Sequence, residues 1–269
     1  MKKNEQGYLE VMKEIMETGH DRSDRTGIGT KAILGSQISF DLTAGFPLLT
    51  TKNVWFKGVA SELLWMLSGS TNVNDLPQDV QKWWTPWASS DGSLGPTYGH
   101  QYRKIVAKDG SIIDQVSDVI DSIKTNPFSR RHIITLWDAE DNKQCNLPPC
   151  HGSIIQFFFF FCKLSCQTYC RSQDWFIGTP VNIAAYALLT HMIARLTNLN
   201  VGQYIHTTGD THIYANHHNQ VQTQMSRSPY DFPQIEITGD QKTIDDFKLE
   251  DFKIINYKRH DKIEAPIAV

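Results

Sequence analysis

Apolar residues recur at helical spacing in several stretches of the chain. Residues 5–18, 55–69 and 112–124 each combine apolar positions three or four apart with polar residues between them, which predicts helices. Residues 5–18 are polar enough on one side to form an amphipathic helix. The clearest helix spans residues 182–199, which are apolar nearly throughout, and we therefore expect it in the core.

Other segments are rich in β-branched and aromatic residues and predict strands: residues 31–42, 47–51, 132–138, 154–161, 164–176 and the strand-like 208–218. The aromatic run 154–161 is too short to cross a bilayer and is interpreted as a strand buried on both faces. Residues 72–103 are rich in turn residues and tryptophan, which predicts a long, partly ordered excursion. Because helices and strands mix without strict alternation, we expect one α+β domain over residues 1–269, with a mixed β-sheet flanked by helices.

Composition adds limits on function. The chain has 269 residues, 20% of them charged, and a formal net charge of -3, as in an ordinary soluble globular protein. The acidic balance gives no reason to expect nucleic-acid binding as the main role, although a local patch and secondary RNA binding stay open. The polar N-terminal residues do not resemble a signal peptide, so we expect a cytoplasmic protein without a membrane partner.

The five cysteines lie at positions 145, 150, 162, 166 and 170. Their odd number and the expected reducing compartment argue against a disulfide framework. Cys162, Cys166 and Cys170 are spaced by four, as in a metal site or on one face of a helix. Their neighbours favour a strand instead, in which all three point to one side as small packing residues, and we expect no metal.

Cys150 follows two prolines and precedes His151 in the motif LPPCH. The prolines stiffen the turn, and cationic groups near a thiol lower its pKa and favour the nucleophilic thiolate. Cys150 is therefore a candidate nucleophile. The alternative is a buried structural cysteine, which is the commoner role of this residue type.

Several arginines are placed to bind an anion. Arg130 and Arg131 are adjacent, Arg171 precedes Ser172, and Arg25 lies in a glycine-rich loop. Arginine beside serine suits a phosphate group, and these four arginines are expected to converge on one. Surface salt bridges are the alternative for any single arginine.

Three further features suggest a binding site. The cluster Trp83–Trp87 could stack on a planar heterocycle or form a small hydrophobic core beneath the loop. Glu62 lies inside an apolar helix and is either tuned for acid–base chemistry or turned to solvent. His212 and Tyr214 alternate onto one face, which suits a sugar hydroxyl, whereas a histidine-rich metal site lacks an evident set of further ligands.

Together these motifs resemble the folate-dependent, cysteine-using thymidylate synthase family over nearly the whole chain. The motifs that carry the resemblance are DRTGIGT, FPLLTTK, ELLWMLSGSTNV, LGPTYGHQYR, NPFSRR, LPPCH, LSCQTYCRSQD, VNIAAYALL and GDTHIYANH. The resemblance implies the reductive methylation of dUMP to dTMP, with 5,10-methylenetetrahydrofolate as carbon and hydride donor. It also implies a two-fold homodimer, because the family shares arginines between subunits.

The resemblance assigns roles residue by residue. Cys150 adds to C6 of dUMP, Glu62 anchors waters that move protons, and Tyr98 helps remove the C5 proton. The remaining residues with an implied catalytic role are His151, Asp174 and Arg171. The residues implied to bind substrate are Arg25, Arg171 and Ser172 on the phosphate, Arg130 and Arg131 from the second subunit, Asn182 on the uracil edge, and His212 and Tyr214 on the ribose 3′-hydroxyl. The residues implied to contact folate are Trp84, Trp87, Asp174, Gly178 and Val269.

The chain departs from the family pattern in a few places. Cys170 replaces a usual glutamine, and Thr179 and Val181 stand where the family usually has leucine and phenylalanine. Near the end, Arg259-His260-Asp261 replaces Pro-His-Pro, and Glu264 replaces lysine. The shorter Val181 bears on whether hydride or water completes the reaction, so a dUMP hydroxymethylase is the alternative activity. A regulatory, RNA-binding role on the same fold is a further alternative, which strongly salt-dependent binding would reveal.

Overall fold

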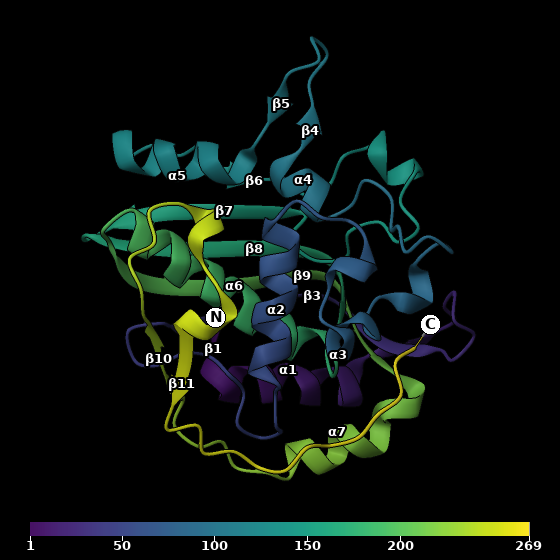
Figure 1. Ribbon diagram of the computed structural model, residues 1–269. Helices are drawn as coiled ribbons and strands as arrows, with labels where there is room; N and C mark the ends of the chain where they lie inside the picture. The colour runs from purple at the N-terminus through teal and green to yellow at the C-terminus, as the bar shows by residue number, and fades with distance from the viewer. Residues whose placement is uncertain (269) are drawn as a thin grey trace.

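The computed structural model describes residues 1–268 and is built around a seven-stranded mixed β-sheet (Figure 1). The strands are β1 (Lys2–Lys3), β2 (His20–Arg22), β3 (Thr30–Asp41), β4 (Ile105–Val106), β5 (Ile112–Ile113), β6 (Ile133–Ile134), β7 (Ile154–Phe160), β8 (Lys163–Asp174), β9 (Asn200–Tyr214), β10 (Gln234–Ile237) and β11 (Phe252–Ile255). The α-helices are α1 (Asn4–Thr18), α2 (Phe56–Leu67), α3 (Gln78–Gln81), α4 (Gly99–Arg103), α5 (Gln115–Thr125), α6 (Gly178–Leu196) and α7 (His218–Met225). The short 3₁₀ turns are η1 (Val73–Asp75), η2 (Thr85–Trp87), η3 (Asp141–Lys143), η4 (Ala215–His217), η5 (Ile244–Asp246) and η6 (Leu249–Asp251).

The large sheet has the strand order β1-β3-β9-β8-β7-β6, and β2 pairs with the edge of β3. Strands β8 and β9 are parallel and are joined through α6, whereas β3–β9, β7–β8 and β6–β7 are antiparallel. A parallel pair requires a long crossover connection, which α6 supplies. The expected α+β fold with a mixed sheet is therefore confirmed.

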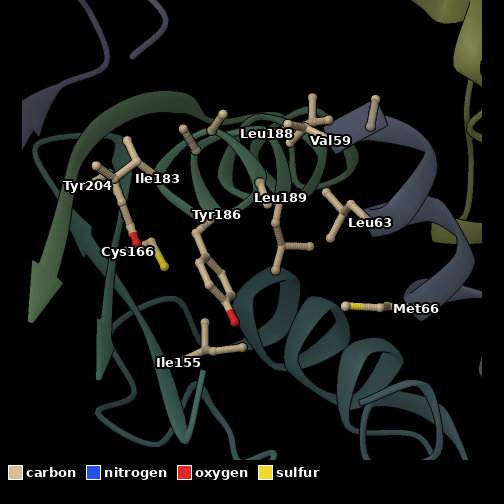
Figure 2. Packing of buried hydrophobic residues seen from close by; sticks show 14 of the residues in the cluster. Val59, Leu63, Met66, Ile155, Cys166, Ile183, Tyr186, Leu188, Leu189 and Tyr204 are labelled. Carbon is tan, nitrogen blue, oxygen red and sulfur yellow. The ribbon is translucent and has the colours of Figure 1, made fainter. Parts of the chain in front are cut away.

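Helix α6 forms the centre of the core (Figure 2). It packs on β8 and β9 on one side and on α2 on the other, so nearly every side of it meets protein. Tyr186 and Leu189 of α6 lie among Leu63 of α2 and Ile155 of β7, and all four are at most 3% exposed. Burial on both sides explains why this helix is apolar nearly all round.

Most of the expected elements are confirmed, with shifted bounds in places. Helices α1 and α2 match the expected stretches, and α6 is confirmed with both ends earlier in the chain, at Gly178 and Leu196 instead of residues 182 and 199. Helix α5 begins later than expected, because β5 occupies Ile112–Ile113 and the Asp114 carboxylate caps the helix by accepting the Ser117 N–H. In residues 72–103 the chain forms short helical turns, and the strand expected over residues 132–138 shrinks to β6.

The strand expected over residues 47–51 is wrong. Thr50 and Thr51 donate their backbone N–H groups and their hydroxyls to the buried carboxylate of Glu5, at distances of 2.7 to 2.8 Å. The Glu5 carboxylate accepts the hydrogen bonds that these backbone amides would otherwise donate to a neighbouring strand.

The aromatic strand is not buried on both faces in this chain. Ile155 and Phe157 of β7 are fully buried, while Ile154 is 47% and Phe160 61% exposed. The strand alternates because helices cover one face of the sheet and nothing in the described chain covers the other.

The three regularly spaced cysteines do not share one face. Cys166 and Cys170 of β8 are buried towards the helices, but Cys162 lies in the β7–β8 turn with φ 58° and is exposed. Cys162 precedes β8, so the alternation of buried and exposed side chains along that strand does not extend to it. Residues 1–268 contain no group of three or more His, Cys, Asp or Glu side chains arranged to hold a metal. None of their helices has the length and apolar character needed to cross a bilayer.

Candidate active site

A cavity of about 590 Å³ opens where α2, the ends of β8 and β9, the start of α6 and the C-terminal segment meet. Its lining includes these residues singled out from the sequence: Arg25, Glu62, Trp84, Trp87, Tyr98, Cys150, His151, Ser172, Asp174, Gly178, Asn182, His212 and Tyr214. Segments more than a hundred residues apart thus contribute side chains to one pocket. Val269, the last of the expected folate contacts, lies outside the described residues.

Cys150 is held in the pocket from both sides. Its N–H donates to the Tyr98 hydroxyl over 3.0 Å, and its carbonyl accepts the N–H of Ser172 over 3.3 Å. Arg171 donates to the carbonyls of Pro148 and Pro149 over 2.9 and 2.8 Å, which fixes the turn before the cysteine. The same guanidinium lies 3.6 Å from the Cys150 sulfur, so the adjacent strand supplies the cationic neighbour.

Burial decides the charge state of the thiol in the free chain. Burial raises the pKa of the Cys150 thiol, and the charges of Arg171 and Arg25 offset part of this rise. The expected lowering of the pKa is therefore wrong for the isolated chain, because the desolvation of a thiolate outweighs two nearby charges. Burial also lowers the pKa of His151 to about 4, so this imidazole is neutral near pH 7 and adds no positive charge.

Tyr98 has a strained backbone beside the cysteine. Its φ is 23°, a region that non-glycine residues rarely adopt. Its ring stacks on His151 with a centroid separation of 4.7 Å and meets Trp84 edge-on at 5.3 Å. Burial, together with the nearby Cys150, raises the pKa of Tyr98 well above its usual value, so it remains a neutral hydroxyl.

Glu62 is turned into the pocket and not to solvent. It is 7% exposed, and among residues 1–268 its only hydrogen-bond partner is the Trp84 indole, whose N–H donates over 2.6 Å. Burial raises the pKa of Glu62 to about 7, with the Trp84 bond opposing the rise. A carboxyl group with this pKa can both hold and release a proton near neutral pH.

Hydrogen bonds fix both Asp174 at the end of β8 and Asn182 in the first turns of α6. The Asn182 amide donates to the side chain of Gln173 over 3.2 Å. Asp174 accepts the N–H groups of Phe176 and Ile177 over 2.9 and 3.1 Å, which holds the turn between β8 and α6. Gln173 therefore orients Asn182, a role that the sequence analysis did not identify.

Another pocket residue missing from the sequence analysis is Lys52. It is 8% exposed, donates to the Phe176 carbonyl, and places its ammonium 3.8 Å from the centroid of the Phe176 ring. Burial lowers its pKa to about 8, opposed by the charge of Asp174. Its position inside the motif FPLLTTK was the available signal.

The expected convergence of four arginines does not occur within one chain. The charges of Arg25 and Arg171 both lower the pKa of Cys150, but Arg130 and Arg131 are exposed between α5 and β6 and do not line the pocket.

The tryptophan cluster has both of the roles expected for it. Trp83, Trp84 and Trp87 line the cavity, and Trp83 also packs edge-on against Trp55, with a centroid separation of 5.8 Å. Stacking surface and small core are thus both present in the tryptophan cluster.

A half-buried thiol with a guanidinium beside it and a carboxyl group of raised pKa in the same pocket is typical of enzymes that act through cysteine. The chain belongs to the thymidylate synthase family, whose family model matches residues 6–269. Membership supports a methyltransferase of dTMP biosynthesis and implies dUMP and methylenetetrahydrofolate as substrates.

Proposed function

We propose that this protein is a thymidylate synthase that converts dUMP to dTMP, with Cys150 as the nucleophile. The observation that carries the proposal is the position of the Cys150 sulfur, 3.6 Å from the Arg171 guanidinium in a pocket shared with Glu62 and Asn182. A thiol, a cation and a base-reading amide in one cavity are the groups that a covalent attack on a pyrimidine requires.

The nucleotide lies across the pocket in this proposal. Its phosphate binds Arg25 and Ser172, which line the cavity, and Arg171, whose guanidinium lies beside the Cys150 sulfur. Its uracil edge binds the Asn182 amide, and its ribose 3′-hydroxyl binds His212 and Tyr214. Bound in this way, C6 of the ring faces the Cys150 sulfur, and attack becomes an intramolecular step.

The Cys150 thiolate then forms a bond to C6, and the electron pair of the C5–C6 double bond moves to C5 and the O4 carbonyl. Because burial raises the pKa of the thiol, positive charge must be supplied to favour the thiolate. Arg171 and Arg25 supply it from the same chain. Arg130 and Arg131 supply more from the second subunit of a homodimer, which agrees with their exposure outside their own pocket.

In this proposal Glu62, Tyr98 and His151 take part in the proton transfers. Glu62, with a pKa of about 7, exchanges protons with waters near O4 of the base. The neutral Tyr98 hydroxyl, anchored by the Cys150 N–H, helps to remove the proton from C5 once the ring carries the sulfur. Neutral His151 is held by a 2.7 Å contact between its Nδ1 and the Tyr186 hydroxyl.

The folate lies along the apolar side of the cavity in this proposal. Trp84, Trp87 and Val181 form an apolar wall of the cavity, and Asp174 at the end of β8 and Gly178 at the start of α6 also line it. Flat aromatic faces suit a pterin ring. When bound, methylenetetrahydrofolate supplies the one-carbon unit and the hydride. Residues 262–268 cover part of the cavity, where the Pro266 carbonyl lies 2.8 Å from the His217 ring, and they exclude water from the site.

Residues 1–269 constitute a single catalytic domain in this proposal, and it acts in the cytoplasm as a two-fold homodimer. The exposed face of the sheet, with Ile154, Phe160 and Tyr169 at least 41% accessible, provides an apolar surface for the second subunit. In this proposal the arginines before β6 of one subunit reach the pocket of the other.

Product analysis tests the proposal. The purified protein is incubated with dUMP and methylenetetrahydrofolate, the nucleotide is identified by mass spectrometry, and absorbance follows dihydrofolate. The proposal expects dTMP and one dihydrofolate per turnover. 5-Hydroxymethyl-dUMP without dihydrofolate would refute the synthase activity and favour the hydroxymethylase. Unchanged dUMP would refute both activities.

A further inference from the structure

An ion pair between Arg22 and Asp210 adjoins His212, the residue proposed to bind the sugar. Arg22 ends β2, and its guanidinium donates to the carboxylate of Asp210 on β9. The other oxygen of Asp210 lies 2.8 Å from Nδ1 of His212. His212 lines the pocket, whereas Arg22 and Asp210 do not.

We propose that Asp210 and Arg22 are positioning residues that fix His212 for the ribose 3′-hydroxyl and connect it to the loop carrying Arg25. This inference rests on the proposed function, because it assumes that His212 meets the sugar of dUMP. Neither residue contacts the nucleotide in this assignment, and both act through His212.

The charge on Asp210 determines which ring nitrogen of His212 faces the sugar. The hydrogen bond from His212, and then the pairing with Arg22, hold the pKa of Asp210 below its usual value, so it is a carboxylate. A carboxylate can only accept hydrogen bonds, and Nδ1 of His212 must therefore carry a proton. Nε2 is then the nitrogen left to meet the sugar hydroxyl, in a ring orientation set by Asp210.

Arg22 has a second, electrostatic effect. Asp210 pairs in register with Ser172 of β8, the residue proposed to bind phosphate. An unpaired carboxylate at this position would repel the nucleotide dianion, and Arg22 neutralises it. The Arg22 side chain is 57% exposed, so its contribution is smaller than that of the shielded Asp210–His212 contact.

The same pair anchors the phosphate-binding loop. Arg22 lies three residues before Arg25, and Asp24 between them folds the loop by accepting the Gly29 N–H over 3.1 Å. Arg22, at the start of the loop, is bound to Asp210 of β9. The same ion pair therefore holds both His212, which binds the sugar, and the loop whose Arg25 binds the phosphate.

The test compares two ligands, dUMP and 2′,3′-dideoxyuridine monophosphate, which differ only in the 3′-hydroxyl. Calorimetry gives the affinity of each for the wild type and for Asp210→Asn. An amide can donate to Nδ1 and permits the wrong tautomer of His212, as known for catalytic histidines. We expect the preference for dUMP to fall about tenfold in Asp210→Asn, the magnitude of one lost hydrogen bond.

Asp240→Asn is the matched control, because Asp240 forms an exposed pair with Lys242 and does not line the pocket. It should retain the wild-type preference. Arg22→Gln, at an exposed position, should show a smaller loss of preference in the same direction, and it decides the matter if Asp210→Asn does not fold.

Equal weakening of both ligands, with the preference for the 3′-hydroxyl intact, would mean that Asp210 acts only on overall structure and would overturn the inference. The proposed function would survive that result. A wild-type protein that binds neither nucleotide would instead overturn the proposed function, and this inference with it.

Discussion

Glu62→Gln offers a test in which stability and activity move in opposite directions. The folded chain raises the pKa of Glu62 from its ordinary 4.5 to about 7, because the carboxyl group is buried, while the hydrogen bond from Trp84 opposes the rise. The folded state therefore binds more protons than the unfolded state between these values, and the free energy of unfolding falls as the pH rises through them.

The magnitude follows from the rise in pKa. The rise to about 7 corresponds to about 3 kcal/mol of lost stability once the pH is above 7. Glutamine keeps the acceptor for the Trp84 indole and has no charge to desolvate. Compared with the wild type, Glu62→Gln should be up to about 3 kcal/mol more stable at pH 8.5 and nearly equal at pH 4.5.

Urea unfolding at several pH values measures this difference. Glu236→Gln on β10 is the control, since its side chain is exposed and it also removes one negative charge. Turnover of Glu62→Gln should fall about 10²- to 10⁴-fold, because an amide is neither an acid nor a base near neutral pH. A difference in stability that does not change with pH would refute the raised pKa, and full activity would refute the proton-transfer role.

Variants of other site residues test the proposed chemistry further. Cys150→Ala should abolish turnover while calorimetry still detects dUMP binding, and measurable turnover would contradict covalent catalysis by this thiol. Asn182→Asp should shift the ratio of kcat/KM values towards dCMP, and an unchanged ratio would contradict the base-reading role. Mixing inactive Cys150→Ala with the inactive double variant Arg130→Ala, Arg131→Ala should restore activity through hybrid dimers with one complete pocket, whereas a mixture that stays inactive after subunit exchange would contradict shared arginines.

Much of the fold was predictable because its helices have strong apolar periodicity. Helix α6 was clear from composition, since it is buried between the sheet and α2. The strand expected at residues 47–51 failed for a reason that local pattern cannot supply: its amides bind Glu5, which lies far away in sequence. The expectation that β7 is buried on both faces failed because burial depends on which elements cover each face of the sheet, and the local sequence does not show this.

The candidate site was predictable as a set of residues but not as a set of charge states. Short motifs identified Cys150, Glu62 and Asn182, and the chain brings all three to one cavity. The raised pKa of the Cys150 thiol depends on burial, which no motif reveals. The exposure of Arg130 likewise reflects its placement between α5 and β6, outside the pocket of its own chain.

In the proposed mechanism the Cys150 sulfur bonds to C6 of the nucleotide. The most direct measurement uses 5-fluoro-dUMP with methylenetetrahydrofolate, because fluorine cannot leave C5 as a proton does and the reaction stops at the covalent stage. Mass spectrometry of the digested protein should find the nucleotide and the folate one-carbon adduct on the peptide that contains Cys150. An unmodified Cys150 peptide, or an adduct on another cysteine, would contradict the proposed mechanism.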